Sequence, residues 1–168
     1  MPTTKKLYLI RHAKSSWDDS NQSDIQRTLN TRGLKDSPLM AELIKGKNII
    51  PDLIISSPAA RALSTAEIFA DVFYYNKKKI VSDERIYEAA TRELITVIRE
   101  IKNENNTVML FGHNPALSNL ANLLCNKFLP DFPTCAVVGI DLKVNSWSEA
   151  ERHCGEIILY EYPKKSLK

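Results

Sequence analysis

An arginine and a histidine stand side by side near the start of the chain, directly after a short apolar run. The run Leu7–Ile10 is typical of a buried strand, and Arg11 and His12 follow it where that strand should end. Because α/β proteins build their sites at the carboxyl ends of strands, we expect both side chains at such an edge. An imidazole nucleophile next to a fixed positive charge is suited to phosphoryl transfer.

A second arginine follows the next apolar run, Leu53–Ser56. The pattern predicts that Ser57 caps a helix and that Pro58 takes its first position, which places Arg61 in the first turn. A helix N-terminus favours anions because its free N–H groups and its dipole both present positive charge. Arg61 is therefore a candidate phosphate ligand, and the alternative is an ordinary surface arginine on a well-capped helix.

A second histidine is placed in the same way. An apolar strand pattern ends at Gly112, His113 follows it, and the next residues predict a helix with Asn114 as its cap and Pro115 as its first residue. His113 would then lie at a strand end beside a helix N-terminus. There it either contributes to an anion site or is structural, hydrogen-bonded under a loop.

The combination of these segments is more specific than any one of them. Three strand ends should bring Arg11-His12, Arg61 and His113 to the same edge of one sheet. The two guanidinium groups can bind phosphoryl oxygens through strong, forked hydrogen bonds. The two histidines then divide the nucleophilic and charge-stabilising roles. The nucleophile needs one ring nitrogen without a proton, so an acceptor must hold its other N–H.

Strand-like and helical patterns alternate along the chain, which predicts one α/β domain over residues 1–168. We expect a three-layer α/β/α sandwich with a mainly parallel central sheet and helices on both faces. The last two strands have no helix between them and should form a hairpin or a sheet edge. The expected strands are Leu7–Ile10, Leu53–Ser56, Ile80–Ser82, Val108–Gly112, Ala136–Leu142 and Ile157–Tyr160.

Helical periodicity places apolar faces within residues 62–73, 94–101 and 117–124. The segment Thr31–Gly46 allows two interpretations because it contains Pro38. Pro38 fits best as the first residue of a helix capped by Ser37, and otherwise lies inside a longer helix.

Bulk composition limits the classes of function. The chain has 168 residues, with 43% hydrophobic and 26% charged, as in ordinary globular proteins. A net charge of +3 is too small to indicate nucleic acid binding, and the basic runs 77–79 and 164–165 are expected to be solvated. We find neither a signal peptide nor a membrane-spanning apolar stretch, so we expect a cytoplasmic protein that binds no membrane. Three scattered cysteines imply no disulfide framework, and His153-Cys154 with His113 lacks metal-ligand spacing, so no metal or cofactor is expected.

Taken together, the motifs resemble the histidine phosphatase superfamily, whose members have a phosphoglycerate mutase-like fold. The resemblance follows the family's order from residue 6 to about residue 124, and within the family it is strongest to the small phosphohistidine phosphatases of the SixA type. Ala13 is common in that subgroup. The matching segments are Arg11–Trp17, Ser57-Pro58-x-x-Arg61-Ala62 with Thr65-Ala66, Gly112-His113-Asn114, and residues 24–33.

The resemblance implies a role for each matching residue. His12 would be the nucleophile that becomes phosphorylated, while Arg11, Arg61 and His113 would bind the phosphoryl oxygens and stabilise their charge. Larger members use an acidic proton donor after the third strand, and Glu88 is the nearest match. The alternative for Glu88 is a surface glutamate near a helix start. No metal or cofactor takes part in this scheme.

The predicted function is a phosphatase that acts through a phosphohistidine enzyme intermediate, with phosphohistidine on another protein as the favoured substrate. The chain leaves little room for a large lid, and residues 83–92 and 143–156 are the expected rim of an open site. Mutases have an asparagine where Asp18 falls, and an aspartate facing phosphate would repel it. The alternatives are a small-molecule phosphomonoesterase of the same superfamily and a phosphate-binding module without turnover.

Overall fold

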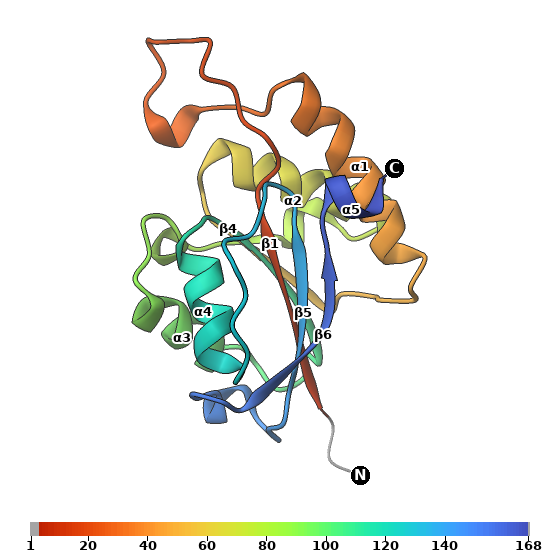
Figure 1. Cartoon of the computed structure of the whole chain (residues 1–168), viewed down its shortest axis with the longest axis vertical. Helices are drawn as coiled ribbons and strands as arrows, with labels where there is room; N and C mark the ends of the chain where they lie inside the picture. The colour runs from red at the N-terminus through yellow and green to blue at the C-terminus, as the bar shows by residue number, and fades with distance from the viewer. Residues whose placement is uncertain (1–3, 168) are drawn as a thin grey trace.

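Strands and helices alternate through most of the chain in a computed structural model that describes residues 4–167 (Figure 1). The strands are β1 (Lys5–Arg11), β2 (Leu53–Ser56), β3 (Val81–Ser82), β4 (Thr107–Gly112), β5 (Val137–Leu142) and β6 (Gly155–Glu161). The α-helices are α1 (Thr31–Lys45), α2 (Ala60–Val72), α3 (Thr91–Arg99), α4 (Ala116–Leu124) and the short α5 (Pro163–Ser166).

All six strands form one sheet in the order β3-β2-β4-β1-β5-β6. The first four strands are parallel to one another, whereas β5 is antiparallel to β1 and β6 is antiparallel to β5. The expected mainly parallel sheet is therefore confirmed. The last two strands form both a hairpin and a sheet edge, as predicted.

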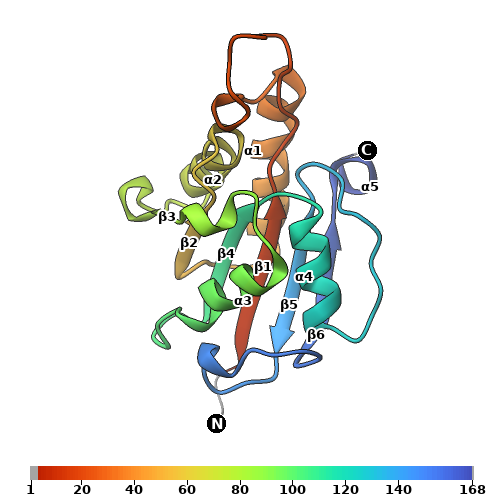
Figure 2. The same ribbon diagram turned by 90° about the vertical axis from the view of Figure 1, so that its left-hand side faces the viewer.

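Helices cover the two faces of the sheet and give it three layers (Figures 1 and 2). Successive residues of a strand point to opposite faces, and β1 shows this directly. Leu7 and Leu9 pack in one buried cluster with α3 and α4, while Tyr8 and Ile10 pack in a second cluster with α1 and α2. This burial on both faces explains why the strand is a continuous apolar run rather than an alternating one.

The helix that contains Pro38 is the longer of the two alternatives. α1 runs from Thr31 to Lys45, and its cap is Asn30, whose side chain accepts from Gly33 N. The preferred prediction, a helix capped by Ser37, is wrong because the Ser37 hydroxyl donates to Gly33 O at 2.7 Å inside the helix.

Two other helices begin later than the sequence predicts. α2 begins at Ala60 rather than Pro58, and α4 begins at Ala116 rather than Pro115. The cap positions are Ala59 and Pro115 rather than Ser57 and Asn114. The Ser57 hydroxyl still accepts from Ala59 N at 3.1 Å just ahead of α2, whereas the Asn114 side chain donates to Phe132 O. Arg61 still lies in the first turn of α2, as expected.

The carboxyl ends of β1, β2 and β4 lie together at one edge of the sheet, and α2 and α4 begin there. The segment of residues 12–30 rises above this edge (Figure 2). Residues 143–156 lie at the opposite edge, because β5 runs antiparallel and ends at Leu142, which pairs with Lys5. The prediction that this segment forms a rim of the site is therefore wrong. No helix between residues 4 and 167 is long and apolar enough to span a membrane.

Candidate active site

The ends of three neighbouring strands place the candidate residues. Beyond the paired strands, His12 N donates to Gly112 O at 3.0 Å, and Ser57 N donates to Phe111 O at 3.0 Å. Since β4 lies between β1 and β2, His113 at its end is flanked by His12 on one side and Ser57 on the other. The predicted convergence of Arg11-His12, Arg61 and His113 on one edge is thus present in the structure.

His12 is buried, with 6% of its surface exposed. Its Nδ1 lies 2.7 Å from Ala13 O, which can only accept, so Nδ1 carries the proton and Nε2 has the free lone pair. Burial lowers the pKa of His12 to about 3, and the nearby His113, Arg61 and Arg11 act in the same direction. The ring is therefore neutral at pH 7 and able to attack through Nε2.

His113 lies against His12, with 5.2 Å between the ring centroids. Its Nε2 is 2.8 Å from the Ser57 hydroxyl. Ser57 Oγ accepts from Ala59 N, and among residues 4–167 its hydrogen has no acceptor other than Nε2, so we assign that hydrogen to Nε2 and the proton of the neutral ring to Nδ1. Burial lowers the pKa of His113 to about 4, with Arg61 as the next cause. The buried Nδ1 has no hydrogen-bond partner among residues 4–167.

Both arginines are held in place by hydrogen bonds from the terminal nitrogens of their guanidinium groups. Arg11 Nη1 donates to Phe132 O at 2.7 Å. Arg61 Nη1 and Nη2 donate to Asp24 O and Oδ2 at 2.7 and 3.0 Å. In both arginines Nε is buried and has no partner in the described part of the chain. Burial lowers the pKa of Arg11, and the charge of Arg61 lowers it further, so the two cations lie close enough to interact.

Three buried N–H groups without partners thus belong to residues close to the neutral imidazole of His12: Nε of Arg11, Nε of Arg61 and Nδ1 of His113. Buried donors in native structures are nearly always satisfied, so a group of unsatisfied ones points to a ligand that accepts from them. Two of the three N–H groups belong to positively charged guanidinium groups. The arrangement is suited to an anion with several oxygens, such as a phosphoryl group.

The residue after the nucleophile is tied to the helix that carries Arg61. Ala13 is fully buried, and its N–H donates to the Thr65 hydroxyl at 3.1 Å. The same hydroxyl donates to Arg61 O at 2.7 Å, one turn earlier in α2. Thr65 therefore fixes the segment that carries His12 relative to the start of α2.

Several residues that contact the site were not singled out from the sequence. Asp24 binds Arg61, and its Oδ2 also accepts from Tyr87 Oη at 2.6 Å. The Tyr87 ring lies edge-on to His113, with 5.7 Å between the ring centroids. The one sequence signal for Asp24 is that it begins the segment 24–33 that resembles the SixA type. The expected rim at residues 83–92 is confirmed by Tyr87.

Glu88 lies near His113 but outside the group of buried donors. It is exposed, and it lines a cavity of about 340 Å³ together with His113 and Asn114. Its backbone has a φ of 53°, in the left-handed region that a glutamate rarely adopts. This geometry turns the chain at the rim of the site. Asp18, the position doubted as a phosphate ligand, is exposed on the segment above the sheet.

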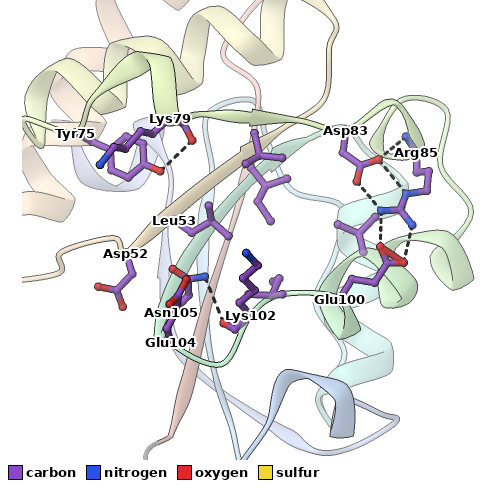
Figure 3. Close-up of a pocket in the computed structure, with 14 residues that line it drawn as sticks. Asp52, Leu53, Tyr75, Lys79, Asp83, Arg85, Glu100, Lys102, Glu104 and Asn105 are labelled. Carbon is purple, nitrogen blue, oxygen red and sulfur yellow. Dashed lines mark hydrogen bonds and ion pairs between the residues drawn. The ribbon is translucent and has the colours of Figure 1, made fainter.

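Other cavities do not contain the candidate residues. One of about 510 Å³ lies beside β2, β3 and α3, where Asp83, Arg85 and Glu100 form ion pairs at its rim (Figure 3). Another, of about 570 Å³, lies near His153 in the segment between β5 and β6. Among residues 4–167, no group of three or more His, Cys, Asp or Glu side chains is arranged to hold a metal ion.

Residues 7–94, just over half of the chain, match the model of the histidine phosphatase superfamily (branch 1). The chain therefore belongs to the histidine phosphatase superfamily, a family of phosphatases and mutases that act through a histidine intermediate. The match includes Arg11, His12, Arg61 and Glu88.

Relatives of known sequence include an uncharacterized chloroplast protein of Arabidopsis thaliana, 28% identical over 88% of this chain and 71% of that protein. A Mycobacterium tuberculosis protein is 26% identical over 92% of this chain and its whole length. The 2,3-bisphosphoglycerate-dependent phosphoglycerate mutase of Bifidobacterium longum is 37% identical over 40% of this chain and 28% of the mutase.

Similar solved structures include the protein histidine phosphatase SixA with tungstate, which has a TM-score of 0.83, 23% identity, and coverage of 97% and 99% of the two chains. A proposed phosphohistidine phosphatase SixA from Agrobacterium tumefaciens has a TM-score of 0.81, 28% identity and the same coverage. With the family match, these neighbours show that the chain is a phosphatase with the phosphoglycerate mutase-like fold.

Proposed function

We propose that His12 is the nucleophile of a two-step phosphatase. Nε2 of His12 attacks phosphorus, the bond from phosphorus to the leaving atom breaks, and water then hydrolyses the phosphohistidine. The observation that carries this proposal is the neutral His12 ring, with its proton held on Nδ1, beside three buried N–H groups that have no partner. Such fixed donors stabilise charge that develops in the transition state.

Each of the other three candidates has a distinct part in this scheme. Nε of Arg11 and Nε of Arg61 bind phosphoryl oxygens as charged donors, and Nδ1 of His113 binds as a neutral one. Ser57 sets the tautomer of His113, because its hydroxyl donates to Nε2. The protein's contribution is mainly positioning and charge stabilisation.

Glu88 is proposed as the proton donor for leaving groups that need one. Its exposed side chain lines the cavity that is also lined by His113. An alkoxide leaves poorly without a proton, whereas an imidazole leaves more easily. An alkyl phosphate would therefore depend on this donor, whereas a phosphohistidine substrate depends on it less.

The proposed substrate is phosphohistidine on a partner protein, encountered in the cytoplasm. Two SixA-type neighbours whose names include phosphohistidine or protein histidine phosphatase support it by analogy. A small phosphate ester is the second candidate, supported by the local identity to a phosphoglycerate mutase.

In the experiment, the protein is incubated with a phosphohistidine-bearing protein and with several phosphate monoesters, each labelled in the phosphoryl group. Label trapped on the enzyme is identified as phosphohistidine if it is labile to acid and stable to base. We expect label on His12 and the highest kcat/KM with the phosphohistidine protein. His12→Ala should abolish turnover and labelling, whereas His153→Ala, which changes an exposed histidine far from the site, should affect neither. Full activity in His12→Ala would contradict the mechanism. Binding of phosphate or vanadate without turnover would favour the non-catalytic module, which vanadate-sensitive hydrolysis of an aryl phosphate would exclude.

A further inference from the structure

One residue, Asp24, engages both terminal nitrogens of the Arg61 guanidinium. Nη1 donates to the main-chain oxygen of Asp24 at 2.7 Å, and Nη2 donates to its Oδ2 at 3.0 Å. A guanidinium presents five N–H groups in a rigid plane, so fixing two nitrogens fixes the direction of the third. That third nitrogen is the buried Nε without a partner.

Asp24 is itself held by two further side chains. Its Oδ1 accepts from Arg27 Nε at 3.1 Å, and its Oδ2 accepts from Tyr87 Oη at 2.6 Å. Arg27 Nη1 in turn donates to Ser15 Oγ at 2.7 Å, three residues after the nucleophile. The Tyr87 hydroxyl, followed by Arg61 and Arg27, lowers the pKa of Asp24 to about 2. The carboxylate is therefore charged in the folded protein at neutral pH.

We propose that Asp24 is a positioning residue that fixes Arg61 with its Nε–H directed at the phosphoryl oxygens. This inference rests on the proposed function, in which Arg61 binds the phosphoryl group. Arg61 has a long side chain with many rotamers, and Asp24 fixes it in one of them before the substrate binds. Substrate binding therefore does not carry the entropy cost of ordering this side chain. Asp24 binds the terminal nitrogens of the guanidinium and leaves the buried Nε for the substrate.

The opposite interpretation is that Asp24 blocks the site as a competing anion. The contacts argue against it, because Asp24 uses only the terminal nitrogens while all three unpartnered donors remain free for an oxyanion. The two interpretations predict opposite results when the charge of Asp24 is removed. A blocking carboxylate weakens oxyanion binding, whereas a positioning carboxylate strengthens it.

The test compares Asp24→Asn and Asp24→Glu with the unchanged protein, using inorganic vanadate as a binding probe and an aryl phosphate as substrate. We expect Asp24→Asn to lower vanadate affinity and kcat/KM by about 10- to 100-fold, the size of effect that misplaced groups produce. Asp24→Glu keeps the carboxylate and should retain more of both. The control is Asp71→Asn, which removes an exposed ion pair with Lys77 and should leave both values unchanged.

A double-mutant cycle separates positioning from a general structural effect. If Asp24 acts through Arg61, Asp24→Asn should change kcat/KM by less than about twofold in an Arg61→Ala background, because the partner is already gone. An equal loss in both backgrounds, unchanged binding, or tighter vanadate binding in Asp24→Asn would each overturn the proposal. Failure of the proposed function would look different: the unchanged protein would bind vanadate without turnover or labelled His12.

Discussion

At the scale of single residues, the informative atoms are buried nitrogens that bond to nothing within residues 4–167. Leaving a buried donor unsatisfied costs about 1–3 kcal/mol, and more for a charged group. Nε of Arg11 and Nε of Arg61 both bear this cost in one small region, beside His12. A protein that only needed structural arginines would pair them, so these nitrogens are best explained by an oxyanion that they bind during function.

Arg61→Ala tests this explanation directly. Removing one preorganised donor at an oxyanion site lowers rates by about 10²–10³, and we expect a loss of that size in kcat for an aryl phosphate. The measurement is steady-state kinetics, with circular dichroism to check folding. Arg92→Ala is the control, since Arg92 is exposed on α3. If the two variants lost activity equally, or not at all, Arg61 would not be a phosphate ligand.

At the scale of secondary-structure elements, two helices at the site begin at other residues than their N-cap patterns predict. Ser57 and Asn114 have the residue types and positions of N-caps, yet neither is one. The Ser57 hydroxyl accepts from Ala59 N ahead of the helix and also meets His113, and the Asn114 side chain donates to Phe132 O at 2.9 Å. Sequence patterns record local preference, so they place the strand ends correctly and miss caps whose side chains are used across the fold.

A second element-scale feature is the contact between α1 and the segment after His12. Asn30 N donates to Lys14 O at 3.0 Å, and Gly33 in the first turn of α1 packs on the same carbonyl group. A Cβ at position 33 would lie 2.2 Å from Lys14 O, which is backbone and cannot turn aside. Only glycine allows this approach, which keeps the His12–Lys14 segment against α1.

Gly33→Ala should therefore destabilise the protein by about 1–3 kcal/mol, as overpacking does, and should lower kcat because the segment carrying His12 must shift. Denaturant unfolding and aryl phosphate kinetics measure the two effects. Gly46→Ala is a matched control at the other end of α1, where φ is −62° and the nearest atom, Leu43 O, would be 3.4 Å away. A Gly33→Ala variant as stable and active as Gly46→Ala would refute the argument.

At the scale of the whole molecule, the sequence predicts those site contacts that follow from the strand topology and misses those that depend on the path of a loop. Arg11, His12 and His113 adjoin strand ends, and parallel strands bring such ends together by topology alone. The contact between Asp24 and Arg61 depends instead on the path of the long segment from β1 to α1. No periodicity or spacing encodes that path, so the resemblance of residues 24–33 could draw attention to Asp24, but its contact with Arg61 could be found only in the folded structure.

The burial of two neutral histidines also gives the whole fold a pH dependence. In the folded protein the pKa values of His12 and His113 are lowered to about 3 and about 4, from an ordinary value of 6.5. Below pH 6.5 the unfolded chain therefore binds more protons at these positions than the folded chain. Stability must then fall as the pH falls from about 6.5 towards 4, whereas Asp24, with its pKa of about 2, has its effect only at lower pH.

We expect the free energy of unfolding to decrease between pH 6.5 and 4.5, with each of the two histidines contributing at most about 1.4 kcal/mol per pH unit. Urea unfolding at a series of pH values measures this slope. His12→Gln and His113→Gln replace the ring with a polar group that does not titrate, so each should reduce the slope, and the double variant should reduce it most. Because all other titrating groups are common to the four proteins, equal slopes would mean that the two rings are already charged in the fold. That result would also remove the neutral Nε2 on which nucleophilic attack by His12 depends.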